Sequence, residues 1–284
     1  MDDEKHINGN KLSKVLRDDI KTVINTKHYK IKLAVILVGN NCESLLYIKY
    51  KKTVFNKIGI GLDLHTFDVG VDEDKLISKI HILNKDSATN GIMIQLPLPS
   101  HLDKDVIVSS VSIDKDVDGC NPINLNSIIS SNPKYIPCTP LACLKILDLM
   151  QIDVIGKHVV VIGKSNTVGL PLALLLSNKK ATVTMCDKFT NNIDSITRSA
   201  DILISACGSP KLIKSHWIKE GVIVLDVGVY YDQTINKYFG DVDYDDVISK
   251  VSLITPNSGG VGPMTITMLL KNLLEAYESQ NNLN

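Results

Sequence analysis

The stretch HVVVIGKSNTVGLP, residues 158–171, decides the fold prediction because it has the order of a strand, a glycine turn and a helix start. Its β-branched run is typical of a parallel strand that is buried on both faces. Gly163 ends the strand, and a helix is expected to begin near Gly169 with Pro171 in its first turn. The N-terminus of such a helix favours an anion. Ser165 replaces the second glycine of the pattern G-x-G-x-x-G, so an ordinary strand-to-helix turn without a ligand stays an alternative.

Three further apolar segments follow this turn at intervals that suit helices or compact crossovers. They are expected strands at residues 181–186, 201–206 and 222–228. This alternation is the doubly wound pattern of a parallel sheet with helices on both faces. Asp187 and Lys188 follow the second strand, where the adenosine ribose lies in such domains. Asp187 suits the 2′-hydroxyl of NAD and Lys188 suits the 2′-phosphate of NADP, and the sequence leaves both cofactors open.

The first half of the chain shows the same alternation without a glycine turn of this kind. Expected helices cover about residues 10–27, 43–58 and 72 onward, and expected strands cover 32–39, 61–67 and 91–99. A further helix is expected to begin with Thr139 as its N-cap and Pro140 in its first position, after which residues 152–157 form the expected hinge.

The last expected helix begins at residue 263 and is apolar on one face, so we expect it to return to the N-terminal domain. The chain is therefore predicted to be an α/β protein of two α/β domains. Residues 1–138, completed by 263–284, form the first domain. Residues 139–262 form the second, which is expected to be Rossmann-like with a parallel sheet.

Composition argues against several classes of protein. Among 284 residues, 31 lysines and arginines balance 31 aspartates and glutamates, so no net field attracts nucleic acid or a membrane. No apolar run approaches membrane-spanning length, and the polar N-terminus does not resemble a secretory signal. The six cysteines form no C-x-x-C pair. We therefore expect reduced thiols in a cytoplasmic protein and no metal site.

Four polar residues of the first half are candidates for chemistry. Tyr47 and Lys51 lie four positions apart in an expected helix and share a face, although residues 49–52 alone are typical of a solvated surface. Gln95 interrupts an apolar strand, so it must face a cavity or be a hydrogen-bonded core amide. Asp118 ends the run DKDVDG, where an Asp-Gly turn is the simpler interpretation.

Nearly the whole chain resembles the bifunctional methylenetetrahydrofolate dehydrogenase/methenyltetrahydrofolate cyclohydrolase family, known in bacteria as FolD. The resemblance is carried by LVGNNCESLLYIKYKK, GIMIQLPLP, DKDVDG, PCTP, VVIGKSNTVGLP, ATVTMC, WIKEGVIVLDVG, GDVDY and TPNSGGVGPMT. It implies oxidation of 5,10-methylenetetrahydrofolate to 5,10-methenyltetrahydrofolate with NADP, followed by hydrolysis to 10-formyltetrahydrofolate. It also implies that Lys51 is the catalytic acid and base, held and tuned by Gln95. Tyr47 would lie against the folate, and Asp118 would bind the pterin.

The same resemblance implies that the first domain binds tetrahydrofolate substrates and that the second binds the nicotinamide cofactor, NADP or alternatively NAD. The implied cofactor contacts are Gly163, Lys164, Ser165, Asn166, Val168, Gly169, Lys188, Gly228, Gly259, Gly260 and Gly262. A homodimer through the second domain is also implied, whereas no metal, nucleic acid or membrane is.

The chain departs from the family pattern beside the cofactor and folate positions. Asn257 and Ser258 stand where Val-Pro is usual, and Asp187 stands where histidine is frequent. Cys120 with Asn121, and residues 208–210, also differ from the usual family residues. Two other classes stay open: another two-domain nicotinamide dehydrogenase, similar to shikimate dehydrogenase, and a non-catalytic dinucleotide sensor.

Overall fold

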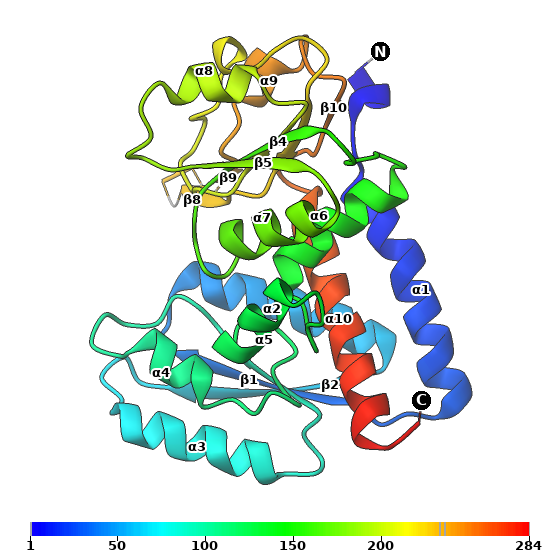
Figure 1. The fold of residues 1–284 in the computed structure, drawn as a ribbon. Helices are drawn as coiled ribbons and strands as arrows, with labels where there is room; N and C mark the ends of the chain where they lie inside the picture. The colour runs from blue at the N-terminus through cyan, green and yellow to red at the C-terminus, as the bar shows by residue number, and fades with distance from the viewer. Residues whose placement is uncertain (1, 233, 236, 284) are drawn as a thin grey trace. The chain divides into compact units, whose positions relative to one another are not determined.

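The computed structural model describes residues 2–232, 234–235 and 237–283 and confirms an α/β protein of two units (Figure 1). Unit 1 contains the chain up to Lys14 together with Thr139–Thr265, and unit 2 contains Val15–Cys138 together with the chain from Ile266. Three helices continue from one unit into the other: α1 (Gly9–Lys27), α6 (Cys138–Leu149) and α10 (Val261–Gln280).

Unit 1 is built around a parallel sheet with the strand order β10-β7-β6-β4-β5. Its strands are β4 (His158–Ile162), β5 (Thr182–Cys186), β6 (Ile202–Ser205), β7 (Ile223–Asp226) and β10 (Leu253–Ile254). Residues 159–162 of β4 expose at most 2% of their surface, as expected for a strand covered on both faces. Because β5 and β6 lie on opposite sides of β4, the ligand crevice of such a sheet is expected at the carboxyl ends of β4 and β6.

The remaining elements of unit 1 connect or flank these strands. They are η1 (Asp2–Lys5), α7 (Gly169–Asn178), α8 (Ile193–Arg198), η2 (Ser215–Trp217), β8 (Tyr230–Asp232), β9 (Lys237–Phe239) and α9 (Tyr244–Val247). Ile193 and Ile196 of α8 pack against a buried cluster that includes Val160 and Leu203. The strands β8 and β9 form a separate antiparallel pair.

The segment before α1 packs in unit 1, whereas the expected domain ranges placed residues 1–14 with the first half of the chain. Ile7 is fully buried, and its N–H donates to the carbonyl of Ile254 in β10 at 2.9 Å. The Lys5 ammonium donates to the carbonyls of Ile248 and Ser249. The reason is that β10 is an edge strand, whose backbone groups need partners.

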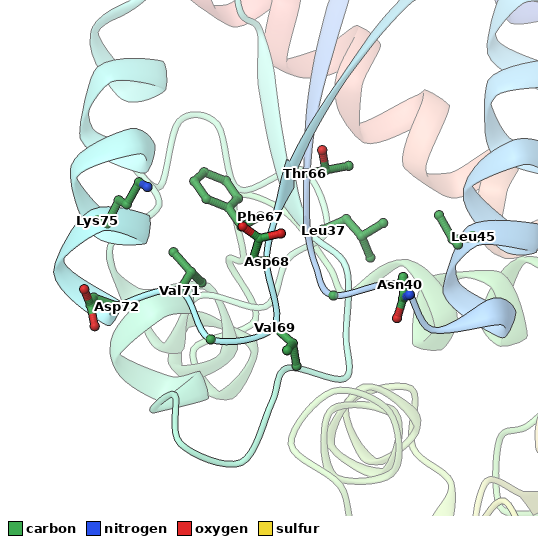
Figure 2. Close-up of a pocket in the computed structure, with 12 residues that line it drawn as sticks. Leu37, Asn40, Leu45, Thr66, Phe67, Asp68, Val69, Val71, Asp72 and Lys75 are labelled. Atoms are coloured by element: carbon green, nitrogen blue, oxygen red, sulfur yellow. The ribbon is translucent and has the colours of Figure 1, made fainter.

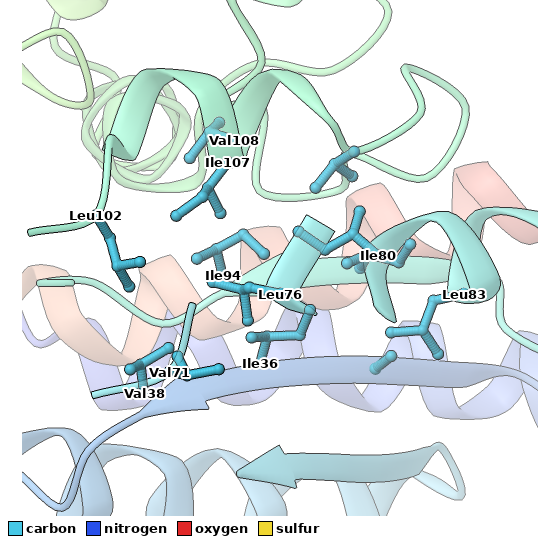
Figure 3. Packing of buried hydrophobic residues seen from close by; sticks show 13 residues of the cluster. Ile36, Val38, Val71, Leu76, Ile80, Leu83, Ile94, Leu102, Ile107 and Val108 are labelled. Carbon is cyan, nitrogen blue, oxygen red and sulfur yellow. The ribbon is translucent and has the colours of Figure 1, made fainter. Parts of the chain in front are cut away.

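Unit 2 contains a three-stranded parallel sheet in the order β2-β1-β3. Its elements are β1 (Lys32–Val38), α2 (Cys42–Ile58), β2 (Gly61–Phe67), α3 (Glu73–Lys85), β3 (Gly91–Ile94), α4 (Lys104–Ser109) and α5 (Pro122–Ile129). One face of the sheet is covered by α3 and α4 through a buried apolar cluster (Figure 3). Ile36 and Ile94 supply this cluster from the sheet, while Leu76, Ile80 and Ile107 supply it from the helices.

The last helix returns to unit 2, as predicted. The Asn272 amide donates to the carbonyls of Val117 at 2.9 Å and Ile136 at 3.0 Å, and the Tyr29 hydroxyl donates to Glu278 at 3.2 Å. These contacts join α10 to segments far away in sequence, so the helix completes the core of unit 2. In the part of the chain that the structure describes, no helix is long and apolar enough to cross a bilayer.

Three boundaries differ from those expected. Helix α6 begins at Cys138, so Thr139 lies inside it rather than capping it, and α10 begins at Val261 rather than at residue 263. The strand expected over 91–99 ends at Ile94. Gln95 still donates its N–H to Ile36 at 2.8 Å, but the prolines that follow lack the N–H needed to continue a ladder.

Candidate active site

Lys51 on α2 is the most unusual ionisable residue of unit 2, because only 1% of it is exposed. Its Nζ donates to Gln95 Oε1 at 3.0 Å and lies 4.2 Å from the centroid of the Tyr47 ring. Burial lowers the pKa of Lys51 to about 8, although the nearby Asp118 carboxylate acts in the opposite direction. An amine with this pKa exists in both protonation states near neutral pH.

The neighbours of Lys51 show that the local cluster of lysines is not one surface. Lys49, Tyr50 and Lys52 are exposed, whereas Lys51 points into the unit. The helix reaches this geometry because Asn41 caps its start by accepting from the Ser44 N–H. The interpretation of residues 49–52 as a solvated surface is therefore wrong for Lys51 and right for the residues on either side.

Gln95 holds its position through both ends of its amide. Its oxygen accepts from Lys51, its nitrogen donates to the Leu96 carbonyl at 2.8 Å, and 7% of the residue is exposed. Gln95 is thus a hydrogen-bonded core amide, and one of its partners is the lysine. An amide stabilises the ammonium without adding a full negative charge, so the Lys51 proton stays easy to remove.

Tyr47 and Asp118 border the buried lysine. Tyr47 is half-buried, and burial followed by the charge of Asp118 raises the pKa of its phenol, which therefore keeps its proton. Asp118 is partly exposed, and its Oδ2 lies 3.6 Å from Cys120 Sγ. The Asp-Gly turn is also present, since Gly119 has a φ of +70° and its N–H donates to the Asp116 carbonyl at 2.9 Å.

Asp116 holds this turn in place, a role that the sequence did not indicate. Its carboxylate accepts from the N–H of Cys120 at 3.1 Å, the N–H of Asn121 at 2.8 Å and the Asn124 amide at 2.7 Å. Only 3% of Asp116 is exposed, and burial raises its pKa to about 7. DKDVDG holds three aspartates at two-residue spacing, and nothing in that spacing marks Asp116 as the one that points inward.

A cavity of about 920 Å³ opens at the carboxyl ends of β1 and β2 (Figure 2). It is lined by Leu37, Gly39, Asn40, Leu45, Thr66, Phe67, Asp68, Val69, Gly70, Val71, Asp72 and Lys75. This described lining does not include Tyr47, Lys51, Gln95 or Asp118. The cavity is thus a separate feature of unit 2, distinct from the site that these four residues form.

In unit 1 the glycine turn brings β4 and α7 into close backbone contact. A Cβ on Gly169 would lie 1.8 Å from the carbonyl oxygen of Gly163, and a Cβ on Gly163 would lie 2.3 Å from the carbonyl oxygen of Ala206. Ser165 Oγ accepts from the Val168 N–H at 3.2 Å, while Asn166 is exposed. The turn therefore has the tight packing and the helix N-terminus that a pyrophosphate site requires.

The two charged residues after β5 have different surroundings. Asp187 forms an ion pair with Lys164 at 3.3 Å and accepts from the Phe189 N–H at 3.0 Å and the Thr190 hydroxyl at 3.3 Å. These contacts lower the pKa of its carboxyl, with the Phe189 N–H first in importance. Lys188 is exposed, with its Nζ 5.1 Å from the Phe189 ring centroid. Asp187 is therefore partly neutralised, and Lys188 keeps its charge available.

The other glycines expected near the cofactor have unequal roles. A Cβ on Gly260 would lie 2.6 Å from the Pro256 carbonyl oxygen, and the Gly259 carbonyl accepts from the Asn10 N–H at 3.1 Å. A Cβ on Gly228 would lie about 2 Å from the Asp241 carboxylate, whereas nothing lies within 4 Å of a Cβ on Gly262. Gly228 and Gly260 therefore make room for the protein itself, whereas Gly262 borders space that no protein atom fills.

No group of three or more histidine, cysteine, aspartate or glutamate side chains among the described residues is arranged to hold a metal ion. The chemistry available in unit 2 is that of a buried amine with an amide partner, a phenol and a carboxylate. Unit 1 offers the backbone turn and paired charges typical of a dinucleotide site. Together these features define a two-unit α/β protein of the dinucleotide-binding class.

Both parts of the chain match domains of one protein family. Residues 7–118 match the catalytic domain of tetrahydrofolate dehydrogenase/cyclohydrolase, and residues 137–281 match the NAD(P)-binding domain of the same family. The chain belongs to the tetrahydrofolate dehydrogenase/cyclohydrolase family. The predicted family membership is thereby confirmed.

Individual relatives agree over almost their whole length. The bifunctional protein FolD of Anoxybacillus flavithermus is 45% identical over 278 residues, which cover 97% of this chain and 98% of the relative. The FolD crystal structure from Campylobacter jejuni superimposes with a TM-score of 0.92 at 40% identity, covering 96% of this chain and 98% of that one. FolD from Trypanosoma brucei, solved with NADP and an inhibitor, has a TM-score of 0.92 at 33% identity, covering 96% and 97%.

The shikimate dehydrogenase alternative fares differently. Shikimate 5-dehydrogenase from Thermus thermophilus, solved with shikimate, has a TM-score of 0.50 at 14% identity, covering 88% of this chain and 98% of that one. At that identity the likeness extends to the fold alone. The two-domain plan is thus shared, and the alternative has no support from the sequence comparison.

Proposed function

We propose that this protein oxidises 5,10-methylenetetrahydrofolate to 5,10-methenyltetrahydrofolate and then hydrolyses the product to 10-formyltetrahydrofolate. The observation that carries this proposal is the buried Lys51–Gln95 pair beside Tyr47, in a chain that belongs to this family. A dinucleotide sensor without chemistry would have no need for a buried lysine whose pKa lies at about 8.

Lys51 is proposed to manage the proton of the hydrolytic step. The methenyl carbon is cationic, so attack by water requires removal of a proton from that water. A neutral Lys51 amine accepts this proton, and the ammonium that forms can return a proton to the folate nitrogen as the ring opens. Gln95 Oε1 and Met93 Sδ accept from Nζ at 3.0 Å and 3.3 Å, so the third position of this nitrogen is the one proposed for the exchange.

Tyr47 and Asp118 are proposed to bind the folate. A phenol that keeps its proton presents a flat, mostly apolar surface against which an aromatic ring packs. The Asp118 carboxylate can accept paired hydrogen bonds from the amino group and ring N–H of a pterin. Its charge also limits how far burial can lower the pKa of Lys51, so one residue affects both binding and proton transfer.

A nicotinamide cofactor is proposed to bind unit 1 at the glycine turn. The residues fit such a group, because Gly163 and Gly169 permit the close backbone approach and α7 presents its N-terminus there. When bound, this cofactor would supply the hydride acceptor for the oxidation. The chain itself only has to hold this cofactor in place, since that step needs no proton donor from the protein.

We propose NADP rather than NAD as the preferred cofactor. Lys188 is exposed and can form a charge-assisted contact with the 2′-phosphate. Asp187 would repel that phosphate, but its ion pair with Lys164 and its hydrogen bonds within the loop offset part of its charge. At this corner of unit 1, the positive charges of Lys164 and Lys188 therefore outnumber the single negative charge of Asp187.

A second copy of the chain is the proposed macromolecular partner. The β8–β9 pair exposes Tyr230 by 44% and Tyr238 by 37%, and Val229 and Ile235 beside it are exposed by 59% each. An apolar surface of this kind is typical of an interface. We further propose a cytoplasmic location, because the five cysteines whose side chains are described are all free thiols.

The proposed function is tested by following absorbance as methylenetetrahydrofolate is supplied with NADP or with NAD. Reduced cofactor should appear together with a transient methenyl absorbance, which decays as hydrolysis proceeds. A protein that binds NADP but produces neither signal would be a sensor, and the proposed function would then be wrong.

A further inference from the structure

Two buried carboxylates lie behind the crevice of unit 1 and have no role in the mechanism described so far. They are Asp226 at the end of β7, which is 6% exposed, and Asp241, which is 1% exposed. Burying two acids together is costly unless each is well hydrogen-bonded. Their partners therefore indicate what the pair does.

Asp226 holds the backbone that carries Asp241. Its Oδ1 accepts from the Asp241 N–H at 3.0 Å and its Oδ2 accepts from the Val242 N–H at 3.2 Å. The Asp226 N–H in turn donates to Thr255 Oγ1 at 2.8 Å. This first carboxylate thus acts only on the main chain, and fixes the direction in which Asp241 projects.

Asp241 holds the loop that follows β6. Its Oδ2 accepts from the Ser205 hydroxyl at 2.9 Å and the Cys207 N–H at 2.8 Å, and its Oδ1 accepts from the Ser209 N–H at 2.7 Å. Hydrogen bonds to a charged acceptor are about twice as strong as neutral ones. Both oxygens of one side chain therefore determine the conformation of residues 205–209.

Two glycines provide the space for these carboxylates. A Cβ on Gly228 would lie 2.1 Å from the Asp241 carboxylate, and a Cβ on Gly240 would lie 1.8 Å from Asp226 Oδ2. These positions can hold only glycine while the carboxylates stay where they are. The position of the Asp241 carboxylate thus requires glycine at residue 228, independently of any contact with a cofactor.

The loop after β6 lies directly beside the glycine turn. The Ala206 N–H donates to the Ile162 carbonyl at 2.8 Å, and a Cβ on Gly163 would lie 2.3 Å from the Ala206 carbonyl oxygen. The carboxyl ends of β4 and β6 form the point of this sheet where a dinucleotide crosses. The loop held by Asp241 is therefore one wall of that crevice.

We propose that Asp241 is a positioning residue for the nicotinamide cofactor, which acts by holding residues 205–209 as a preformed wall of the crevice. This inference rests on the proposed cofactor site. An asparagine at position 241 would direct its NH₂ group at the N–H of either Cys207 or Ser209, because both oxygens already accept backbone N–H groups. The loop would then lose its fixed conformation, and the cofactor would have to order it on binding.

The test measures the Kd of NADP and NADPH for the full-length protein by calorimetry and by NADPH fluorescence. Asp241→Asn should raise the Kd by about tenfold or more. It should also raise the KM for NADP, while kcat at saturating NADP stays within about threefold of the parent, because a loop ordered by the bound cofactor lines the same crevice. Faster hydrogen exchange at the Cys207 and Ser209 amides should accompany the weaker binding.

Two further variants make the test decisive. Asp245→Asn removes the same charge from an exposed position of α9 and should leave the Kd unchanged. If Asp241→Asn does not fold, Ser205→Ala decides: it removes a single neutral donor and should raise the Kd by about threefold. An unchanged Kd in folded Asp241→Asn, or in Ser205→Ala when that variant decides, would overturn the inference. If the parent itself bound neither NADP nor NAD, the proposed function would be wrong instead.

Discussion

The site around Lys51 in unit 2 and the glycine turn of unit 1 differ in the part of the chain on which they depend. The first depends on one buried side chain, Lys51, whose pKa is lowered to about 8 by burial and whose partner is a neutral amide. The second depends on backbone, where Gly163 and Gly169 allow close contact and the charged residues around it are paired or exposed. Substitutions that remove side-chain atoms should therefore impair the site of unit 2 most, and substitutions that add side-chain atoms should impair the site of unit 1 most.

The largest effect is expected for Lys51→Met. Methionine keeps much of the length and fits an apolar setting but cannot carry a proton, so hydrolysis of methenyltetrahydrofolate should fall by about a hundredfold or more. Oxidation of methylenetetrahydrofolate should fall much less, because that step moves no proton through the lysine. Stopped-flow absorbance would show methenyltetrahydrofolate accumulating, and hydrolysis at the parental rate would remove Lys51 from the mechanism. Lys52→Met, at an exposed position of the same helix, is the matched control.

Side chains added to the glycines of unit 1 should produce the next largest effect. Gly260 and Gly262 distinguish a clash within the protein from a clash with the cofactor. Gly260→Val should disturb the loop itself, since a Cβ there would lie 2.6 Å from a backbone oxygen. Gly262→Val meets nothing within 4 Å in the protein, so stability should be retained. If the cofactor approaches this loop, Gly262→Val should still weaken NADP binding by about tenfold, measured by calorimetry with thermal unfolding as the check. Parental affinity in a stable Gly262→Val protein would mean that the cofactor stays away from residue 262.

Asp118 allows a prediction about pH that only the structure supplies. Hydrolysis by the parent should rise as pH increases through about 8, because Lys51 acts as a base only after it loses its proton. The Asp118 carboxylate favours the ammonium form, so Asp118→Asn should shift this rise to lower pH while weakening folate binding.

Pre-steady-state hydrolysis across pH 6 to 10, at saturating folate, would measure that shift. Asp114→Asn changes an exposed acid of the same segment and should leave the midpoint in place. A midpoint that moves to higher pH in Asp118→Asn would contradict the electrostatic argument.

The contrast between the units also explains what could be predicted from sequence. The valine run of β4 and the glycine turn predicted the strand, the turn and the helix, because these depend on local residue types. The burial of Lys51 could not be predicted in the same way. Its neighbours in sequence are exposed, and its partner Gln95 lies 44 positions further on. Lys51 and Gln95 meet only because α2 packs against the end of β3 in the folded chain.

Asp116 differs, because its partners lie only four to eight positions further along the same segment. Asp241 illustrates the limit more sharply: it looks like an ordinary turn residue in GDVDY, yet it accepts from backbone N–H groups 34 and 32 positions earlier. Such partners depend on where distant segments meet, and a pattern within one segment holds no record of them. Asp187 is similar, since its pairing with Lys164 depends on the register of β4 against β5.

The smallest effects are expected at the corner of Asp187 and Lys188, where two substitutions should act with opposite sign. Lys188→Ala removes a positive charge beside the 2′-phosphate, so the KM for NADP should rise by about fivefold while that for NAD stays nearly constant. Asp187→Asn removes a charge that repels the phosphate and weakens the acceptor for the 2′-hydroxyl of NAD. The ratio of kcat/KM for NADP over NAD should therefore fall in the first variant and rise in the second.

Lys237→Ala is the matched control for Lys188→Ala, because both lysines lie over a phenylalanine ring, at 5.5 Å and 5.1 Å from its centroid. Lys237 is on β9, so its loss should leave the ratio unchanged. Two changes in the same direction at positions 187 and 188 would mean that the loop after β5 responds as a whole to any substitution. Cofactor choice would then be set by the shape of this loop, and the argument from individual charges would be wrong.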